Sequence, residues 1–313
     1  MSTLRWLGGA LVAAVTTTAA RSRLGSTPPG GTDRWVRTNH QGEPVSLLEG
    51  PAVAAGLVAG TLAAGGSARS RLGHTTAAVG ALVFGLVDDL GEDTSTRSKG
   101  LRGHLGAALR GDLTTGALKV LGIGATGVLA AALAPSREPG STGRRAVDLV
   151  VDGAVVAGAA NLVNLLDLRP GRALKAGSAA ALVLSTTGTT AGSGPAGAVL
   201  GAAAAASPAD LAGDDMLGDS GANALGALLG SAVVQGTSRP VRATVLLVLV
   251  GLTLASERVS FSQVIARTRW LDAVDRWGRA PATSPAVPAG PADAPADAGE
   301  GQPPAVTDGS PRP

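Results

Sequence analysis

The chain of 313 residues contains no cysteine and no tyrosine, and its other aromatic side chains are four tryptophans and two phenylalanines. Without cysteine it can form neither disulfides nor thiolate metal sites. Charged residues are also scarce, at 16%, whereas soluble domains carry about a quarter. The formal net charge is only +3, and no basic block predicts a nucleic-acid-binding arm. These deficits favour a membrane protein that binds no nucleic acid.

Long apolar segments recur along the chain. Hydrophobic residues make up 45% of it, the mean hydropathy is +0.26, and glycine is frequent, as is usual where helices pack closely in lipid. The sequence predicts an all-α fold, a polytopic transmembrane helix bundle of about nine spans. The predicted spans are residues 4–20, 51–66, 73–87, 114–134, 146–166, 176–190, 194–206, 221–236 and 241–256.

Two parts of this topology have alternatives. Segment 4–20 also has the length of a cleaved signal peptide, but Arg21 and Arg23 follow it, and this charge order favours an uncleaved span with its N-terminus outside. The pair 176–190 and 194–206 is rich in Gly, Ser and Thr. If neither segment spans, the sidedness of the rest is unchanged; if only one fails, the C-terminal part is inverted.

The distribution of lysine and arginine predicts the orientation. One set of alternate connections holds 16 of these residues and the other set holds 6, so the richer set is expected in the cytoplasm. The richer set comprises residues 21–49, 88–113, 167–175, 207–220 and 257–279. The chain is therefore predicted to be a multi-pass protein of the cytoplasmic (plasma) membrane with a cytoplasmic C-terminus.

The composition changes near residue 280. Residues 1–279 form the predicted integral membrane domain, whereas 280–313 are dominated by Pro, Ala, Gly and Asp. Such a composition cannot bury a core, so we expect a disordered cytoplasmic tail.

Acidic side chains stand at predicted helix ends on the cytoplasmic side. Asp88 and Asp89 follow the third apolar segment, and Asp219 enters the eighth. Acids so close to hydrocarbon tend to be functional, and paired carboxylates suit a hard cation such as Mg²⁺, which commonly binds phosphate as well. A solvated acidic loop at Asp88, or an ordinary N-cap at Asp219, is the alternative.

Other polar residues accompany these acids. Asn161, Asn164 and Asp167 recur at three-residue spacing, so a helix would place them on one face. Interhelical hydrogen bonding is the alternative role for the two asparagines. Arg37 and Asn39 lie in the first cytoplasmic connection, whose alternative interpretation is a plain charged loop. Together, carboxylates, amides and basic residues at one membrane face supply what phosphoryl transfer requires.

These segments, in this order, resemble the polyprenyl-phosphate N-acetylhexosamine-1-phosphate transferase superfamily, which contains phospho-MurNAc-pentapeptide translocase and the UDP-GlcNAc:undecaprenyl-phosphate enzymes. The similarity covers about residues 30–260. It rests on Arg37-x-Asn39-x-x-Gly42-x-x-Val45, Asp88-Asp89, Lys99-Gly100-Leu101, Asn161-x-x-Asn164-x-x-Asp167 and Leu217-Gly218-Asp219-Ser220-Gly221.

The resemblance implies a Mg²⁺-dependent enzyme of cell-envelope synthesis, and membrane enzymes of this type are often homodimers. A polyprenyl phosphate would attack the β-phosphate of a UDP-sugar, giving polyprenyl-diphospho-sugar and UMP. The resemblance implies that Asp219 and Asp89 bind the metal. It assigns the pair Asp88 and Asp89 either to metal binding or to deprotonation of the lipid phosphate. It further implies substrate contacts from Lys99, Asn161, Asn164, Asp167, Arg37 and Asn39.

The chain departs from the family pattern in three places. Glu92 occupies a position that usually holds Asp or Lys, the segment after Asp167 lacks a further Asp, and 257–279 contains no histidine. These departures leave the sugar open and support an alternative, a catalytically silent relative that binds a lipid carrier or a partner protein. A solute transporter is a third interpretation, although its polar residues would be expected near the bilayer midplane.

Overall fold

The computed structural model describes residues 2–39, 42–91, 115–134, 140–186 and 190–280, and within them the chain is almost entirely helical. The predicted all-α class is confirmed. The long helices are α1 (Ser2–Ser26), α2 (Glu49–Ala63), α3 (Ala68–Gly91), α5 (Thr115–Leu133), α6 (Thr142–Leu166), α7 (Arg172–Thr186), α8 (Thr190–Ala212), α9 (Gly218–Gly236) and α10 (Arg239–Ser256).

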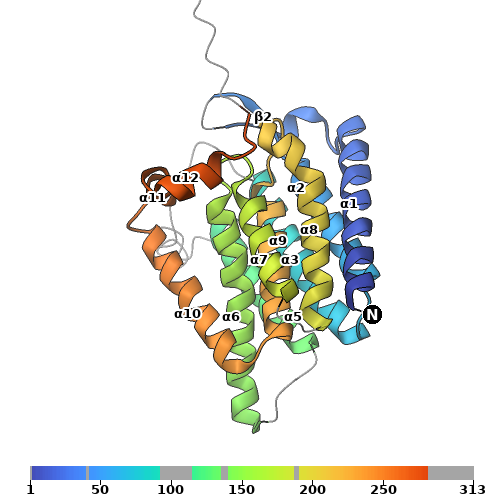
Figure 1. Ribbon diagram of the computed structural model, residues 1–313, viewed down its shortest axis with the longest axis vertical. Helices are drawn as coiled ribbons and strands as arrows, with labels where there is room; N and C mark the ends of the chain where they lie inside the picture. Colours follow the sequence, from blue (N-terminus) through green and yellow to red (C-terminus); the bar gives the residue numbers. More distant parts are fainter. Residues whose placement is uncertain (1, 40–41, 92–114, 135–139, 187–189, 281–313) are drawn as a thin grey trace, which may run out of the picture. The chain divides into compact units, whose positions relative to one another are not determined.

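The shorter elements lie in the connections. A 3-10 turn (Thr32–Arg34) leads into an antiparallel pair of strands, β1 (Val36–Thr38) and β2 (Pro44–Ser46), in which Val36 is opposite Ser46. Two short helices, α11 (Phe261–Arg267) and α12 (Arg269–Arg276), follow α10. Figure 1 shows β2, α11 and α12 toward one end of the bundle and the N-terminus of α1 at the other.

The nine predicted apolar segments fall on these long helices. Segment 51–66 extends too far, because α2 ends at Ala63 and is followed by Gly65 and Gly66 with φ of +77° and +105°. Such angles are readily available only to glycine and end the helix. Both members of the pair 176–190 and 194–206 are largely helical, as α7 and α8.

Two helices of the described chain, α6 and α10, are long and apolar enough to cross a membrane by length and composition. Several of the others are short; α7, with 15 residues, extends about 22 Å at 1.5 Å per residue, less than a hydrocarbon core of about 30 Å. The length and composition of α6 and α10 indicate a membrane protein. The nine-span topology and its orientation remain predictions.

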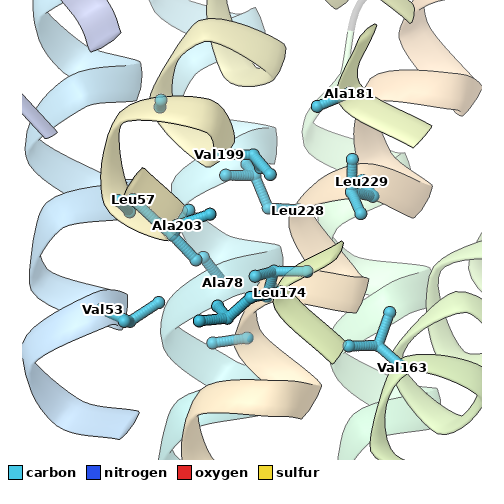
Figure 2. Packing of buried hydrophobic residues seen from close by; sticks show 14 of the residues in the cluster. Val53, Leu57, Ala78, Val163, Leu174, Ala181, Val199, Ala203, Leu228 and Leu229 are labelled. Atoms are coloured by element: carbon cyan, nitrogen blue, oxygen red, sulfur yellow. The ribbon is translucent and has the colours of Figure 1, made fainter. Parts of the chain in front are cut away.

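Helix α9 lies at the centre of the bundle. It packs against α2, α3, α5, α6, α7 and α8, and nearly all of its residues are buried. The core around it consists mainly of Ala, Val and Leu; Figure 2 shows Val53, Leu57, Val199 and Leu228 packed together. Small side chains allow these helices to approach closely, so the packing of α9 fixes the position of its first turn.

Large apolar side chains also cover outward-facing parts of the helices. On α10, Leu247 is 74% exposed and Leu254 is 60% exposed. Other exposed apolar residues on α1, α5, α6 and α7 include Leu4, Leu11, Val15, Leu121, Val147, Val150, Leu182 and Val183. Apolar exposure of this extent is uncommon on soluble monomers and calls for a lipid or protein covering.

The described part of the chain belongs to one compact unit that extends to Ala280. The backbone N–H of Ala280 donates a hydrogen bond to the Leu211 carbonyl at 3.0 Å. Except for Ala280, the predicted disordered tail 280–313 lies outside the described residues.

Candidate functional site

The last turn of α3 meets the first turn of α9. The Asp89 carboxylate accepts hydrogen bonds from the backbone N–H groups of Asp219 and Ser220, both at 2.9 Å. These donors have no partner within their own helix, and Leu217, at the N-cap, offers no side-chain acceptor. Asp89 therefore caps α9 from a neighbouring helix, and its charge is favourable at this positive helix end.

Lys119, in α5, joins the two other acids of this group. Its Nζ lies 2.6 Å from Asp88 Oδ2 and 2.8 Å from Asp219 Oδ2. The three side chains are largely buried, with exposures of 13–24%, so the ammonium group offsets the repulsion between the two carboxylates. We refer to Asp88, Asp89, Lys119 and Asp219 as the acid–lysine cluster.

Sequence reasoning missed Lys119. It is a single basic residue near the start of the predicted apolar span 114–134, and that position was the available signal. A charged residue inside such a span is uncommon and usually faces a polar partner.

Glycines bring the helices of the site into backbone contact. A Cβ added to Gly85 would overlap the Asp219 carbonyl oxygen, and one added to Gly50 would overlap the Leu217 carbonyl oxygen. The Gly221 position is equally close to the backbone of Gly50. Only glycine fits here, and this close approach of α2, α3 and α9 holds the acids at hydrogen-bond distance.

The β-hairpin brings a second cation to the cluster. The Arg37 guanidinium donates to the backbone carbonyl of Asp89 and also to the carbonyls of Arg34 and Val36. Asn39 shapes the same hairpin, since its Oδ1 accepts the Glu43 N–H at 3.0 Å. Arg37 thus contacts the cluster through the Asp89 backbone, whereas the hydrogen bond between Asn39 and Glu43 lies within the hairpin.

The predicted asparagine stripe separates along α6. Asn161 donates to Thr253 Oγ1 of α10 at 3.1 Å, which is the interhelical role considered for it. Asn164 is half-buried one turn later, and Asp167 follows directly after the helix.

Asp167 lies close to Gly218 at the start of α9, and its buried Oδ2 has no hydrogen-bond partner among the residues that the structure describes. Burial raises the pKa of Asp167 well above its usual value, and the negative charges of Asp210 and Asp219 raise it further. Asp167 therefore belongs to the same helix-end group of acids as Asp219.

A second acidic group, not anticipated from the sequence, borders the first. Glu49 and Asp210 are each 2% exposed and their carboxyl groups lie beside each other; Asp210 Oδ1 accepts the Gly171 N–H at 2.6 Å. Asp215 is 3% exposed and is paired with Arg21 through two contacts of 2.6 Å. Glu49 stands directly before a predicted apolar span, so its position alone could have identified it.

The donor set is compatible with Mg²⁺. Among the residues that the structure describes, no three His, Cys, Asp or Glu side chains are grouped as a metal site. Mg²⁺, however, commonly takes one or two protein carboxylates and completes its coordination with water and substrate phosphate. Asp88 and Asp219 could supply such a pair, because one ammonium group already reaches an oxygen of each.

Lys99 and Glu92 lie outside the described residues. The structure thus brings together Asp88, Asp89, Asp219, Asp167 and Arg37 from the predicted set, and adds Lys119. It directs Asn161 toward a neighbouring helix instead. In comparisons with protein-family models and with curated proteins, nothing matches this chain.

Proposed function

We propose that the protein is a Mg²⁺-dependent transferase that moves a sugar-1-phosphate from a UDP-sugar to a polyprenyl phosphate. The observation that carries the proposal is the acid–lysine cluster at the junction of α3, α5 and α9. Its carboxylates can bind a divalent cation, and its lysine and the helix N-terminus can bind anionic phosphates. The resemblance in motif order supplies the substrate class.

We infer that the bundle is embedded in the plasma membrane with this cluster at the cytoplasmic face. Two helices have the length and composition of spans, and the outward faces of α1, α5, α6, α7 and α10 carry exposed Leu and Val. Of the described connections, those at the end of the bundle that holds the acids, 21–49, 167–175 and 257–279, carry most of the Lys and Arg. This charge bias supports a cytoplasmic location for that end.

In the proposed reaction, an oxygen of the polyprenyl phosphate attacks the β-phosphorus of the UDP-sugar. The bond between β-phosphorus and the oxygen that bridges to the α-phosphate breaks, UMP leaves with the electron pair, and polyprenyl-diphospho-sugar remains. Bound Mg²⁺ would neutralise diphosphate charge and so lower the repulsion between the two anionic reactants.

The protein residues have separate tasks in this proposal. Asp219 and Asp88 would hold the cation, and Lys119 would move toward phosphate oxygens as its carboxylates engage the cation. Asp89 positions the first turn of α9, because its two backbone hydrogen bonds fix the N–H groups of Asp219 and Ser220. Arg37 steadies the end of α3 through the Asp89 carbonyl.

An assay of UMP release tests the proposal. Purified protein would be incubated with undecaprenyl phosphate, Mg²⁺ and a panel of UDP-sugars. We expect UMP with at least one donor and none after Asp219→Asn, which retains the shape of the side chain but removes its charge. Asp272→Asn is a matched control, because Asp272 lies in α12 and pairs with Arg276 of the same helix at 3.0 Å. UMP release by Asp219→Asn at the wild-type rate would refute the role of Asp219.

A catalytically silent relative is the second candidate. The contact of Lys119 with both carboxylates favours it, because the ammonium group already supplies the positive charge that a metal would bring. This candidate predicts retained binding of polyprenyl phosphate with no UMP from any donor, the outcome that would exclude the transferase.

A further inference from the structure

Helices α11 and α12 lie at the end of α10 and carry an unusual share of the aromatic residues. Phe261, Trp270 and Trp277 are half of the phenylalanines and tryptophans in the whole chain. Trp270 is 68% exposed and Trp277 is 76% exposed. Large aromatic side chains are costly to leave in water, so their exposure indicates a surface that something covers.

The large exposed apolar side chains at α12 form one stripe. Trp270 and Val274 lie in the helix and Trp277 directly follows it; their spacing of four and three residues places them on the same face. Asp275 lies on a different face and is buried, where it accepts hydrogen bonds from Arg172 of α7 at 2.7 and 3.1 Å. The ion pair thus fixes the rotation of α12 and keeps the tryptophan stripe outward.

Arginines border this stripe. Arg269 and Arg276 lie on a third face of α12, and the Arg276 side chain is 71% exposed. Two further exposed arginines flank α11, Arg258 before it and Arg267 at its end. A short amphipathic element with tryptophans on one face and arginines beside them is typical of a helix at a membrane–water interface. Its positive charge is complementary to anionic phospholipid headgroups.

The stripe is also positioned next to an apolar helix surface. Leu247 and Leu254 of α10 are among the most exposed apolar residues of the bundle, and the chain passes from α10 into α11 within a few residues. Figure 1 shows α11 and α12 beyond the carboxyl end of α10 and turned across its direction. A membrane covering α10 would therefore have its surface near α12.

We propose that α11 and α12 form an interfacial anchor for anionic phospholipid, with Trp270 and Trp277 at headgroup depth and the neighbouring arginines on lipid phosphates. This inference rests on the proposed membrane location of the bundle but not on its enzymatic activity. A protein partner covering the same stripe is the competing occupant, and the experiment below distinguishes the two.

The test is fluorescence quenching in proteoliposomes. Full-length protein would be reconstituted in vesicles of phosphatidylglycerol and phosphatidylcholine, with bromine near the headgroup end of the acyl chains. The fluorescence of Trp270 and Trp277 is obtained by subtracting the emission of the double variant Trp270→Phe/Trp277→Phe from that of the wild type. We expect brominated lipid to cause a clear loss of this difference signal and a greater loss with phosphatidylglycerol than with phosphatidylcholine alone.

Matched variants separate lipid binding from general effects. Arg267→Gln/Arg269→Gln should reduce the dependence on phosphatidylglycerol, whereas Arg145→Gln, exposed near the start of α6 at the other end of the bundle, should leave it unchanged. Resistance to carbonate extraction reports separately on membrane embedding. An embedded protein whose difference signal is not quenched would overturn the anchor, and extraction of the protein would instead refute the membrane location.

Discussion

Lys119 is the residue whose environment most constrains the chemistry of the site. It contacts one oxygen of Asp88 and one of Asp219, and it belongs to α5, whereas the acids belong to α3 and α9. Its loss would remove the ammonium group that both carboxylates contact. Unpaired charges in a partly buried site are costly, because burial weakens their solvation while their repulsion persists.

We therefore predict that Lys119→Met lowers the free energy of unfolding by roughly 2–3 kcal/mol in the absence of divalent cations. Added Mg²⁺ should restore part of that stability, because the cation can take the place of the ammonium group between the carboxylates. Thermal unfolding in detergent with and without Mg²⁺ measures both effects. If Mg²⁺ stabilises the wild type and the variant equally, the carboxylate pair is not the cation site.

At the scale of helices, the site depends on backbone contact between α3 and α9. Gly85→Ala would place a methyl group against the Asp219 carbonyl, and overpacking against rigid backbone costs about 1–3 kcal/mol. We expect the variant to be less stable and to lose activity, because the separation of the helices also breaks the Asp89 cap.

Gly124→Ala is the matched control for this change. A Cβ at Gly124 would meet nothing within 4 Å, so this substitution in α5 should be neutral or stabilising by up to about 1 kcal/mol. Thermal unfolding and UMP release compare the two variants. Equal behaviour of Gly85→Ala and Gly124→Ala would contradict the close packing of α3 on α9.

The attachment of α12 depends on the ionisation of Asp275. Burial disfavours the charged form, but the hydrogen bonds and charges of Arg172 and Arg279 together outweigh it and hold the pKa of Asp275 below its usual value. Because the folded-state pKa is lowered, the stabilising contribution is present above the ordinary carboxyl pKa of about 3.9 and is lost as the pH falls below it.

We predict that acidification below about pH 3.9 loosens α12 in detergent-solubilised protein and changes the emission of Trp270 and Trp277. In Asp275→Asn, whose amide does not titrate, the same emission should resemble the acid form at all pH values. A wild-type emission that stays constant to well below the ordinary carboxyl pKa, or an Asp275→Asn variant that titrates as the wild type does, would refute this account.

At the scale of the whole molecule, much of the architecture was predictable. Long apolar segments such as 146–166 and 241–256 indicated α6 and α10 because helical length and hydrophobicity are local properties. The placement of Asp88, Asp89 and Asp219 at helix ends followed from the same pattern. Lys119, Glu49 and Asp210 could not be grouped with them from sequence, because their proximity depends on how distant helices pack around α9.

Membrane orientation is the broadest property that follows from the proposal. A reporter fused after residue 280 should lie in the cytoplasm, and one fused before Ser2 should lie outside, because the connections at the acid-bearing end hold most of the lysine and arginine. The side of each fusion point can be measured with two reporter enzymes, one active only in the cytoplasm and one active only outside. A reporter after residue 280 that appears outside would place the acid–lysine cluster away from cytoplasmic UDP-sugars.

Transfer of phosphorus from donor to lipid tests the central claim most directly. A UDP-sugar labelled in its β-phosphate would be incubated with undecaprenyl phosphate, Mg²⁺ and purified protein, and label in the lipid phase would be measured. The proposed reaction predicts that the label enters the lipid phase with the wild type and stays in water with Asp219→Asn. Label that remains in water with the wild type for every donor, while the protein still binds the lipid, would contradict it.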